Sequence, residues 1–318
     1  MLIESNEISF VLQGPIVEHV TSTSISNIRK LFPNSYIIIS TWNNAEVDNI
    51  AADRVILNND PGPTIVEFDK KGNARTTNVN RQIVSTVAGL KAVRTKFAVK
   101  VRTDNIINGC DWLAHFDEYT QRNEEYSIFE NRIIASSLYA KEVAKGISVP
   151  YFYSDFFHFG LTNDLLTLWD IDCLKEPFFN PRKLGKKQHK QAPNRLLHIE
   201  QILFLKCLNK FTKTKLMDEY GQRSDIKKSI NLLVNNFIVL DSKELEIIVP
   251  ARLNQVNTFP YKFSDHQRWL WLYEKAFNLP LTGSVKFRIK WWLARLFKLF
   301  HKGIRNTIKT TWIRRKTR

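Results

Sequence analysis

An arginine and a carboxylate stand directly after one short apolar stretch of the sequence. Apolar residues alternate with other side chains over residues 97–101, and Arg102 and Asp104 follow. The alternation predicts a buried strand, and α/β sheets bind ligands at the carboxyl ends of their strands. The pair suits a diphosphate held directly or through Mg²⁺ or Mn²⁺, because these ions share phosphate oxygens and need few protein carboxylates. Taken alone, the pair better suits a surface ion pair that only closes the strand, and the rest of the sequence has to favour the ligand site.

Three earlier apolar runs predict further strands whose loops should meet at the same edge. The runs span residues 8–12, 36–40 and 54–57. The loops after them contain Gln13-Gly14-Pro15, Thr41 and Asp60-Pro61-Gly62. Parallel strands place such loops around one cleft, which favours a nucleotide or sugar-nucleotide pocket over a plain scaffold. The sequence has neither GxGxxG nor GxxxxGK[ST], which argues against a dinucleotide fingerprint or a P-loop.

A helix is predicted over residues 78–93, because apolar residues recur there three or four positions apart. Asn80 and Arg81 lie in its first turn. An amide and a guanidinium at that end of a helix can face a phosphate group. Alternatively, Asn80 only caps the helix, and Arg81 is only a solvated side chain.

Two later carboxylates lie in apolar surroundings. Asp155 interrupts the aromatic run at 151–161, which is typical of a carbohydrate pocket but also of a core strand with one polar break. Glu200 lies in a predicted apolar helix over 196–208, either placed for function or on the wet face of that helix. The stretch 179–193 holds five Lys or Arg and predicts a mobile basic loop, which either closes over phosphates or is a solvated insertion.

The remaining elements complete an α/β pattern in one domain spanning residues 1–283. Further helices are expected at 24–32 and 109–126 and around Trp269, Trp271 and Tyr273. Further strands are expected at 132–138, 230–240 and 245–249.

The composition is that of a globular chain. Its 318 residues are 43% hydrophobic and 12% aromatic, enough for one large core or two modest ones. No apolar run approaches the roughly 18 residues of a membrane span, and acidic residues occupy the start, so the chain is expected in the cytoplasm. Three widely spaced cysteines fit a reducing compartment without a disulfide framework or a zinc knuckle.

Positive charge is concentrated at the end of the chain. Residues 284–318, here called the tail, contain twelve Lys or Arg and no Asp or Glu, so they account for twelve of the sixteen net positive charges. Basic residues occupy one helical stripe of the tail, and an apolar stripe consists of Ile289, Trp292, Leu296, Phe300, Ile304 and Ile308. Such a basic amphipathic helix favours an anionic membrane surface. Nucleic acid is the rival partner.

The ordered blocks Gln13-Gly14-Pro15, Ser40-Thr41-Trp42, Asp60-Pro61-Gly62, Asn80-Arg81-Gln82 and Arg102-Thr103-Asp104 resemble the WavE family of lipopolysaccharide-synthesis proteins, which are similar to GT-A glycosyltransferases. The resemblance is strongest over the first 105 residues or so, and looser around Asp155 and Glu200.

The resemblance implies a GT-A-like, Rossmann-type, mostly parallel sheet flanked by helices and followed by the tail. It implies a nucleotide-sugar donor, a UDP-sugar by preference, held by Gln13, Gly14, Pro15, Thr41, Asp60, Asn80, Arg81 and Arg102. It puts Asp104 in the place of the metal-binding DxD signature, with Arg102 where the first Asp would stand.

The same resemblance implies a carboxylate that takes the proton of the acceptor hydroxyl, Glu200 by its order in the chain or else Asp155. The acceptor would be a lipid-linked saccharide of lipopolysaccharide, O-antigen or capsule synthesis at the cytoplasmic face of the inner membrane, with no nucleic acid involved. A nucleotidyltransferase on a similar fold and a nucleic-acid-binding protein with a basic tail are the alternatives.

Overall fold

The structure, a computed structural model, describes residues 3–68, 72–176, 197–216, 218–253 and 261–317. The basic stretch predicted at 179–193 lies outside the described residues.

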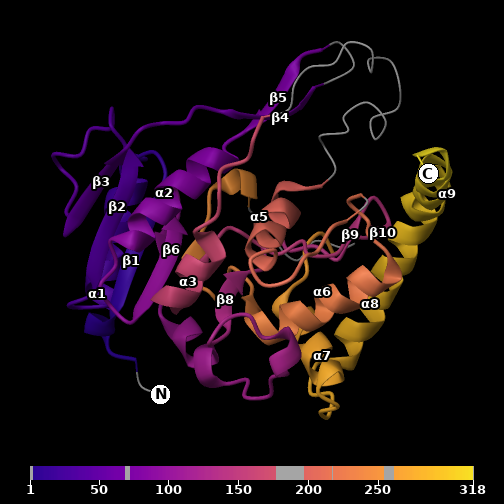
Figure 1. Cartoon of the computed structure of the whole chain (residues 1–318). Coiled ribbons are helices and arrows are strands. Elements are labelled where there is room, and N and C mark those ends of the chain that lie inside the picture. The colour runs from indigo at the N-terminus through magenta and orange to yellow at the C-terminus, as the bar shows by residue number, and fades with distance from the viewer. Residues whose placement is uncertain (1–2, 69–71, 177–196, 217, 254–260, 318) are drawn as a thin grey trace.

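A seven-stranded sheet forms the centre of the molecule (Figure 1). In spatial order its strands are β12 (Phe237–Leu240), β8 (Ile133–Ser136), β11 (His158–Leu161), β6 (Phe97–Arg102), β1 (Ile8–Gln13), β2 (Tyr36–Trp42) and β3 (Arg54–Asn58). All neighbouring pairs are parallel except those of β11, which runs antiparallel to β6 and β8. The predicted fold class is confirmed: an α/β protein with a mostly parallel sheet flanked by helices and a helical tail.

The central strands are apolar runs because helices and loops cover both faces of the sheet. Every residue of β1 is buried. The helix α2 (Val79–Lys91) packs on β1 and β2, and α1 (Val20–Leu31) precedes β2. Since β1, β2, β3 and β6 all run in one direction, the loops after them meet at one edge, as the sequence predicted.

Shorter elements surround this sheet. The two-stranded pairs are β4 (Thr64–Phe68) with β5 (Ala74–Thr77), β7 (Ile106–Ile107) with β13 (Ile247–Ile248), and β9 (Val143–Ala144) with β10 (Ile147–Ser148). The other helices are α3 (Thr162–Trp169), α5 (Ile199–Leu208), α6 (Arg223–Asn236) and α7 (His266–Ala276).

The prediction of a helix over residues 109–126 is wrong. Two short 3-10 segments stand there instead, Asp111–Asp117 and Glu124–Tyr126. The buried guanidinium of Arg132 donates to two backbone carbonyls of the chain between the segments. Those carbonyls therefore bond to an arginine rather than to amides four residues further along.

The strand predicted at 230–240 is right only for Phe237–Leu240, because the preceding residues end α6. Asn236 is fully buried, and its side-chain carbonyl accepts from the amide of Ile128 at 2.7 Å. An apolar run of this length fits a buried helix and a buried strand equally well, and contacts distant in sequence decide between them.

The aromatic run at 151–161 is strand only over its last four residues. Tyr151 has φ 57°, a left-handed conformation that breaks an extended chain. The rings of Tyr151, Phe152, Tyr153 and Phe156 are at most 7% exposed, so they are core residues rather than a platform for sugars.

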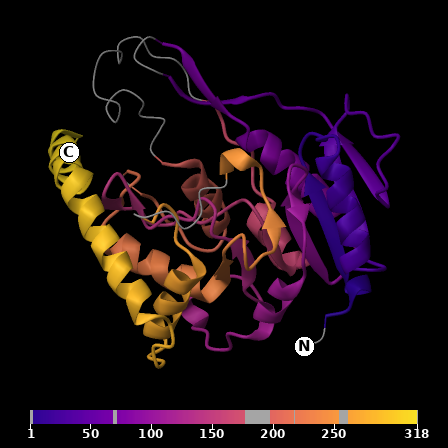
Figure 2. The ribbon, with the colours of Figure 1, turned by 180° about the vertical axis from the view of Figure 1, so that it is seen from behind.

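The tail is helical, as predicted. Its helix α8 (Val285–Lys298) continues through a π-helical turn (Leu299–Gly303) into α9 (Ile304–Thr317). Together they form one rod on the side of the molecule opposite β3 (Figures 1 and 2). Within the described residues no helix is long and apolar enough to span a membrane.

Candidate functional site

A cleft of about 1560 Å³ opens at the carboxyl edge of the parallel strands. We call it the strand-edge cleft. Seven of the predicted binding residues line it: Gln13, Gly14, Pro15, Asp60, Arg81, Arg102 and Asp104. The sequence argument that these loops converge is therefore confirmed.

The loop after β1 is fixed across the sheet to the end of β6. The hydroxyl of Thr103 donates to the carbonyl of Pro15 at 2.6 Å. Gly14 has φ 119°, and a Cβ atom there would lie 3.2 Å from the Thr103 hydroxyl. A glycine is therefore required for this close approach. Gln13 is turned inward, where its side-chain carbonyl accepts from the hydroxyl of Ser85 at 2.8 Å.

Two arginines enclose Asp104 at the end of β6. Arg102 donates to both carboxylate oxygens, at 2.8 and 2.7 Å, and Arg252 donates to one of them at 2.9 Å. Burial of the Asp104 carboxyl opposes its ionisation, but the hydrogen bonds and charges of the two guanidiniums outweigh burial and hold its pKa below the usual range. The cluster keeps a net charge of about +1 beside the cleft, which suits an anionic ligand.

These residues do not form a ready set of metal ligands. Asp104 is the carboxylate predicted to bind Mg²⁺ or Mn²⁺, and both of its oxygens already bond to guanidiniums. Among the residues that the structure describes, no three His, Cys, Asp or Glu lie close enough together to hold an ion. A metal ion would have to displace an arginine from Asp104, so metal binding at this residue stays a prediction.

The predicted residues around α2 divide between the cleft and the scaffold. Arg81 donates to both carboxylate oxygens of Asp60 at 2.7 and 2.6 Å, and this pair lines the cleft. The side-chain amide of Asn80 instead bonds to the backbone of Leu174 in both directions, at 2.9 and 2.7 Å. Thr41 is fully buried in β2 and does not line the cleft.

A second cleft, of about 1030 Å³, adjoins the first, and Thr77 and Ile199 line both. We call it the Glu200 cleft. Glu200 lies in the first turn of α5, where burial and then the negative charge of Asp155 raise its pKa to about 7. The amide of Glu200 and the charge of Lys141 oppose that rise. A carboxylate with such a pKa takes up protons near neutral pH, as a general base must.

Two hydrogen bonds to its backbone carbonyl hold Asp155 in place. Lys100 in β6 and Gln82 in α2 both donate to its backbone carbonyl, Gln82 at 3.1 Å. Lys100 is completely buried, and burial lowers its pKa to about 7. The structure thus brings the two predicted candidates for the base, Glu200 and Asp155, into one electrostatic neighbourhood beside the strand-edge cleft.

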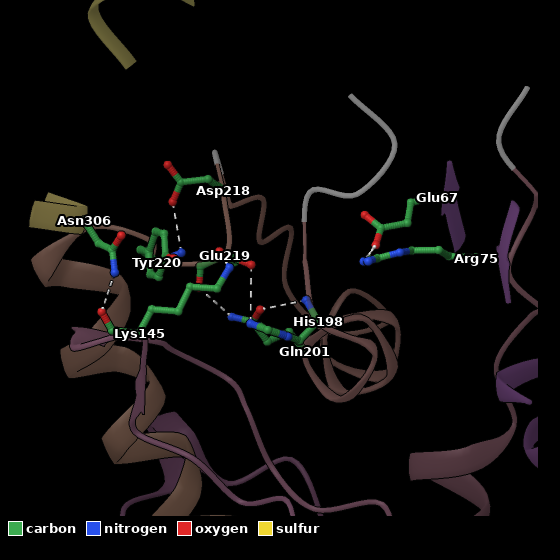
Figure 3. Close-up of polar contacts among 9 residues, drawn as sticks. All are labelled: Glu67, Arg75, Lys145, His198, Gln201, Asp218, Glu219, Tyr220 and Asn306. Atoms are coloured by element: carbon green, nitrogen blue, oxygen red, sulfur yellow. Dashed lines mark hydrogen bonds and ion pairs between the residues drawn. The ribbon is translucent and has the colours of Figure 1, made fainter. Parts of the chain in front are cut away.

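Contacts with neighbouring loops hold the first turn of α5, which contains Glu200 (Figure 3). The side-chain amide of Gln201 donates to the carbonyl of Glu219 at 3.0 Å. It also donates to the carbonyl of Pro150 at 2.7 Å. The carboxylate of Glu219 lies 3.3 Å from His198, the residue before α5. These contacts fix the direction of the first turn of α5, and with it the position of Glu200.

Sequence reasoning missed Arg252 and Lys100. Arg252 comes from a 3-10 turn 148 residues after Asp104, and nothing near it in the sequence indicates a site. Lys100 did carry a signal, because it is a charged residue inside a strand otherwise buried on both faces.

The fold and the two clefts define an α/β protein with a large cleft at the carboxyl edge of a mostly parallel sheet. The chain belongs to the WavE lipopolysaccharide synthesis family, whose model matches residues 8–305. The predicted resemblance is thereby confirmed over nearly the whole chain. No curated protein shows significant sequence similarity to it.

Among the solved structures that are similar to this chain in part are two enzymes. One is 4-diphosphocytidyl-2C-methyl-D-erythritol synthase from Anaerococcus prevotii, with 12% identity, a TM-score of 0.33, and coverage of 70% of this chain and 96% of that one. The other is glucosyl-3-phosphoglycerate synthase from Mycobacterium tuberculosis in complex with Mn²⁺, UDP and phosphoglyceric acid, with 12% identity, a TM-score of 0.35, and coverage of 87% and 80%. Scores this low do not bear on the chemistry of this chain.

Proposed function

We propose that this chain is a GT-A-like glycosyltransferase that moves a sugar from a nucleotide-sugar donor, a UDP-sugar by preference, to a lipid-linked saccharide. The acceptor belongs to lipopolysaccharide, O-antigen or capsule synthesis at the cytoplasmic face of the inner membrane. One observation carries the proposal. A cleft lined by three arginines and a cleft that holds a carboxylate with a raised pKa adjoin each other in a member of a lipopolysaccharide synthesis family.

The strand-edge cleft suits the donor. Its arginines at positions 81, 102 and 252 offer guanidinium groups to a diphosphate, whose negative charge grows as the bond to the sugar breaks. Asp104 fixes two of these guanidiniums before the ligand arrives, so they need little reorganisation during the reaction. We assign no step to a metal ion.

The Glu200 cleft suits the acceptor. The bond between the anomeric carbon and the diphosphate oxygen breaks, and the diphosphate leaves with the electron pair. An acceptor hydroxyl oxygen forms the new bond to that carbon, and its proton passes to the carboxylate of Glu200. Asp155 maintains the proton affinity of Glu200 through its charge.

A panel of nucleotide sugars tests the proposal, with the released nucleotide measured by chromatography. Glycosyl transfer, or hydrolysis of the donor without an acceptor, releases a nucleoside diphosphate. A nucleotidyltransferase on the same fold would release pyrophosphate from a nucleoside triphosphate instead. Turnover of one donor that depends on Arg102 supports the proposal, and pyrophosphate release with no donor turnover refutes it.

A further inference from the structure

The tail presents an apolar face to the outside of the molecule. Eleven of the sixteen exposed large hydrophobic residues in the described chain lie between positions 285 and 312. The predicted stripe belongs to them: Ile289, Trp292, Leu296, Phe300, Ile304 and Ile308 are 37% to 70% exposed. We call these six residues the apolar face. Patches of this extent mark interaction sites.

A π-helical turn keeps this face on one side of the rod. Most of its residues are four positions apart, and an α-helix rotates about 40° past a full turn in four residues. The π-helical turn Leu299–Gly303 contains about one residue more than a turn of α-helix. The side chains after it are therefore rotated back by part of the angle that has accumulated along the α-helix. The face therefore extends from Ile289 to Ile308, about 28 Å at 1.5 Å per residue.

The opposite side of the rod is bound to the body. Trp291 packs edge-on against Trp271, with ring centroids 5.6 Å apart, and the guanidinium of Arg268 lies 3.9 Å above it. Arg295 donates to the hydroxyl of Ser148 at 2.7 Å. These contacts fix which side of the rod faces outward, so the exposure of the apolar face is a consequence of the fold.

Further along, the rod approaches the 143–148 hairpin backbone to backbone. Gly146 has φ 84°, and a Cβ atom there would lie 2.4 Å from the amide nitrogen of Gly303. The side-chain amide of Asn306 donates to the carbonyl of Lys145 at 2.9 Å (Figure 3). Lys145 in turn lies 3.6 Å from Glu219, which contacts the start of the Glu200 helix. The tail is thus held close to the acceptor side of the site.

The positive charge of the tail indicates which kind of partner the apolar face binds. The tail has twelve basic residues and no acidic one, and Lys302, Arg305 and Lys309 beside the face are exposed. A second copy of this basic rod would have to accept that charge without compensation. A bilayer of anionic lipids satisfies both features, because acyl chains take the apolar side chains and headgroups take the cations.

We propose that the apolar face of the tail lies in the interface of an anionic lipid bilayer and docks the protein on the membrane surface without spanning it. This inference does not depend on the proposed chemistry. If the chemistry holds as well, docking brings the Glu200 cleft near lipid-linked acceptors.

Co-sedimentation of the full chain with vesicles tests the docking. The probes are vesicles of phosphatidylcholine with 30% phosphatidylglycerol and vesicles of phosphatidylcholine alone. We expect binding to the first at least about 10-fold stronger than to the second. A triple variant of the face, Trp292→Ser with Phe300→Ser and Ile308→Ser, should bind anionic vesicles about 100-fold more weakly. The control, Leu57→Ser with Phe211→Ser, removes two exposed apolar residues from elsewhere, 48% and 53% exposed, and should bind as the parent does.

A charge variant separates lipid from other partners. Replacing Lys302, Arg305 and Lys309 by Gln should weaken vesicle binding about 100-fold at low salt and far less at high salt. Equal sedimentation of the parent and the face variant would refute the proposal. So would duplex or single-stranded nucleic acid binding that survives in the face variant while anionic vesicles are not bound. A concentration-dependent dimer that the face variant abolishes, without any vesicle binding, would assign the face to a second copy instead.

Discussion

Replacing Glu200 by Gln tests the chemistry most directly. The amide keeps the size of the side chain and cannot accept a proton. Loss of a general base lowers turnover about 10² to 10⁴ fold, so kcat for transfer should fall by that amount. Donor binding depends on the strand-edge cleft and should be retained, so KM for the nucleotide sugar should stay within about 2-fold.

The structure also sets the pH dependence of the parent enzyme. The pKa of Glu200 is raised to about 7, first by burial and then by the charge of Asp155. A base is active when it is deprotonated, so activity should rise with pH through about 7. With that pKa about half of the sites are active at pH 7 and about one tenth at pH 6. The residual activity of Glu200→Gln should lack this rise.

Asp155→Asn then checks the origin of the raised pKa. Removing the neighbouring negative charge lowers the pKa of Glu200, so the rise in activity should move to lower pH. The assay is nucleotide release between pH 5 and 9 for each variant, with Glu125→Gln as a control at an exposed carboxylate outside both clefts. An unchanged pH profile and unchanged kcat in Glu200→Gln would refute the assignment. If Asp155→Asn alone abolishes turnover, the two roles are exchanged.

Four further predictions follow from the same geometry. Arg252→Gln should lower kcat/KM for the donor about 10- to 100-fold without unfolding the protein, whereas Arg94→Gln, on the surface outside the clefts, should change nothing. If the arginines that bond to both oxygens of Asp104 do the work of a metal ion, transfer by the parent should persist in excess chelator, measured as nucleotide release. Lys100→Met should lower kcat about 10-fold and shift the pH profile, since it removes one of the two donors to the backbone carbonyl of Asp155. Gly146→Ala should lower the free energy of unfolding by about 1 to 2 kcal/mol or more in a denaturant titration.

The pattern of apolar and polar residues in the sequence predicted the central strands well. The runs at β1, β2 and β6 are buried on both faces, so they stand out from polar loops. The pattern failed where an apolar run fits a helix and a strand equally well, as in the residues before β12. It also failed around Arg132, whose guanidinium takes carbonyls that a helix would have used.

The site was predictable to the extent that it follows from strand direction. Parallel strands bring their carboxyl ends together, which placed Gly14, Asp60 and Asp104 at one cleft. Residues that reach the cleft from distant loops leave no such trace, and Arg252 is the clearest case. The raised pKa of Glu200 depends on Asp155 and on burial, which are properties of the folded chain alone.

The surroundings of Asp104 also decide how its substitution should be interpreted. Asp104→Ala removes a predicted metal ligand, and it equally releases the two guanidiniums that Asp104 orients. Loss of activity in that variant would therefore fit both accounts. Only the chelator experiment separates them, because an orienting carboxylate needs no ion. If chelator abolishes transfer and Mn²⁺ restores it, Asp104 must exchange an arginine for the metal when the donor binds, and Arg252, the more exposed of the two arginines, is the partner it would release.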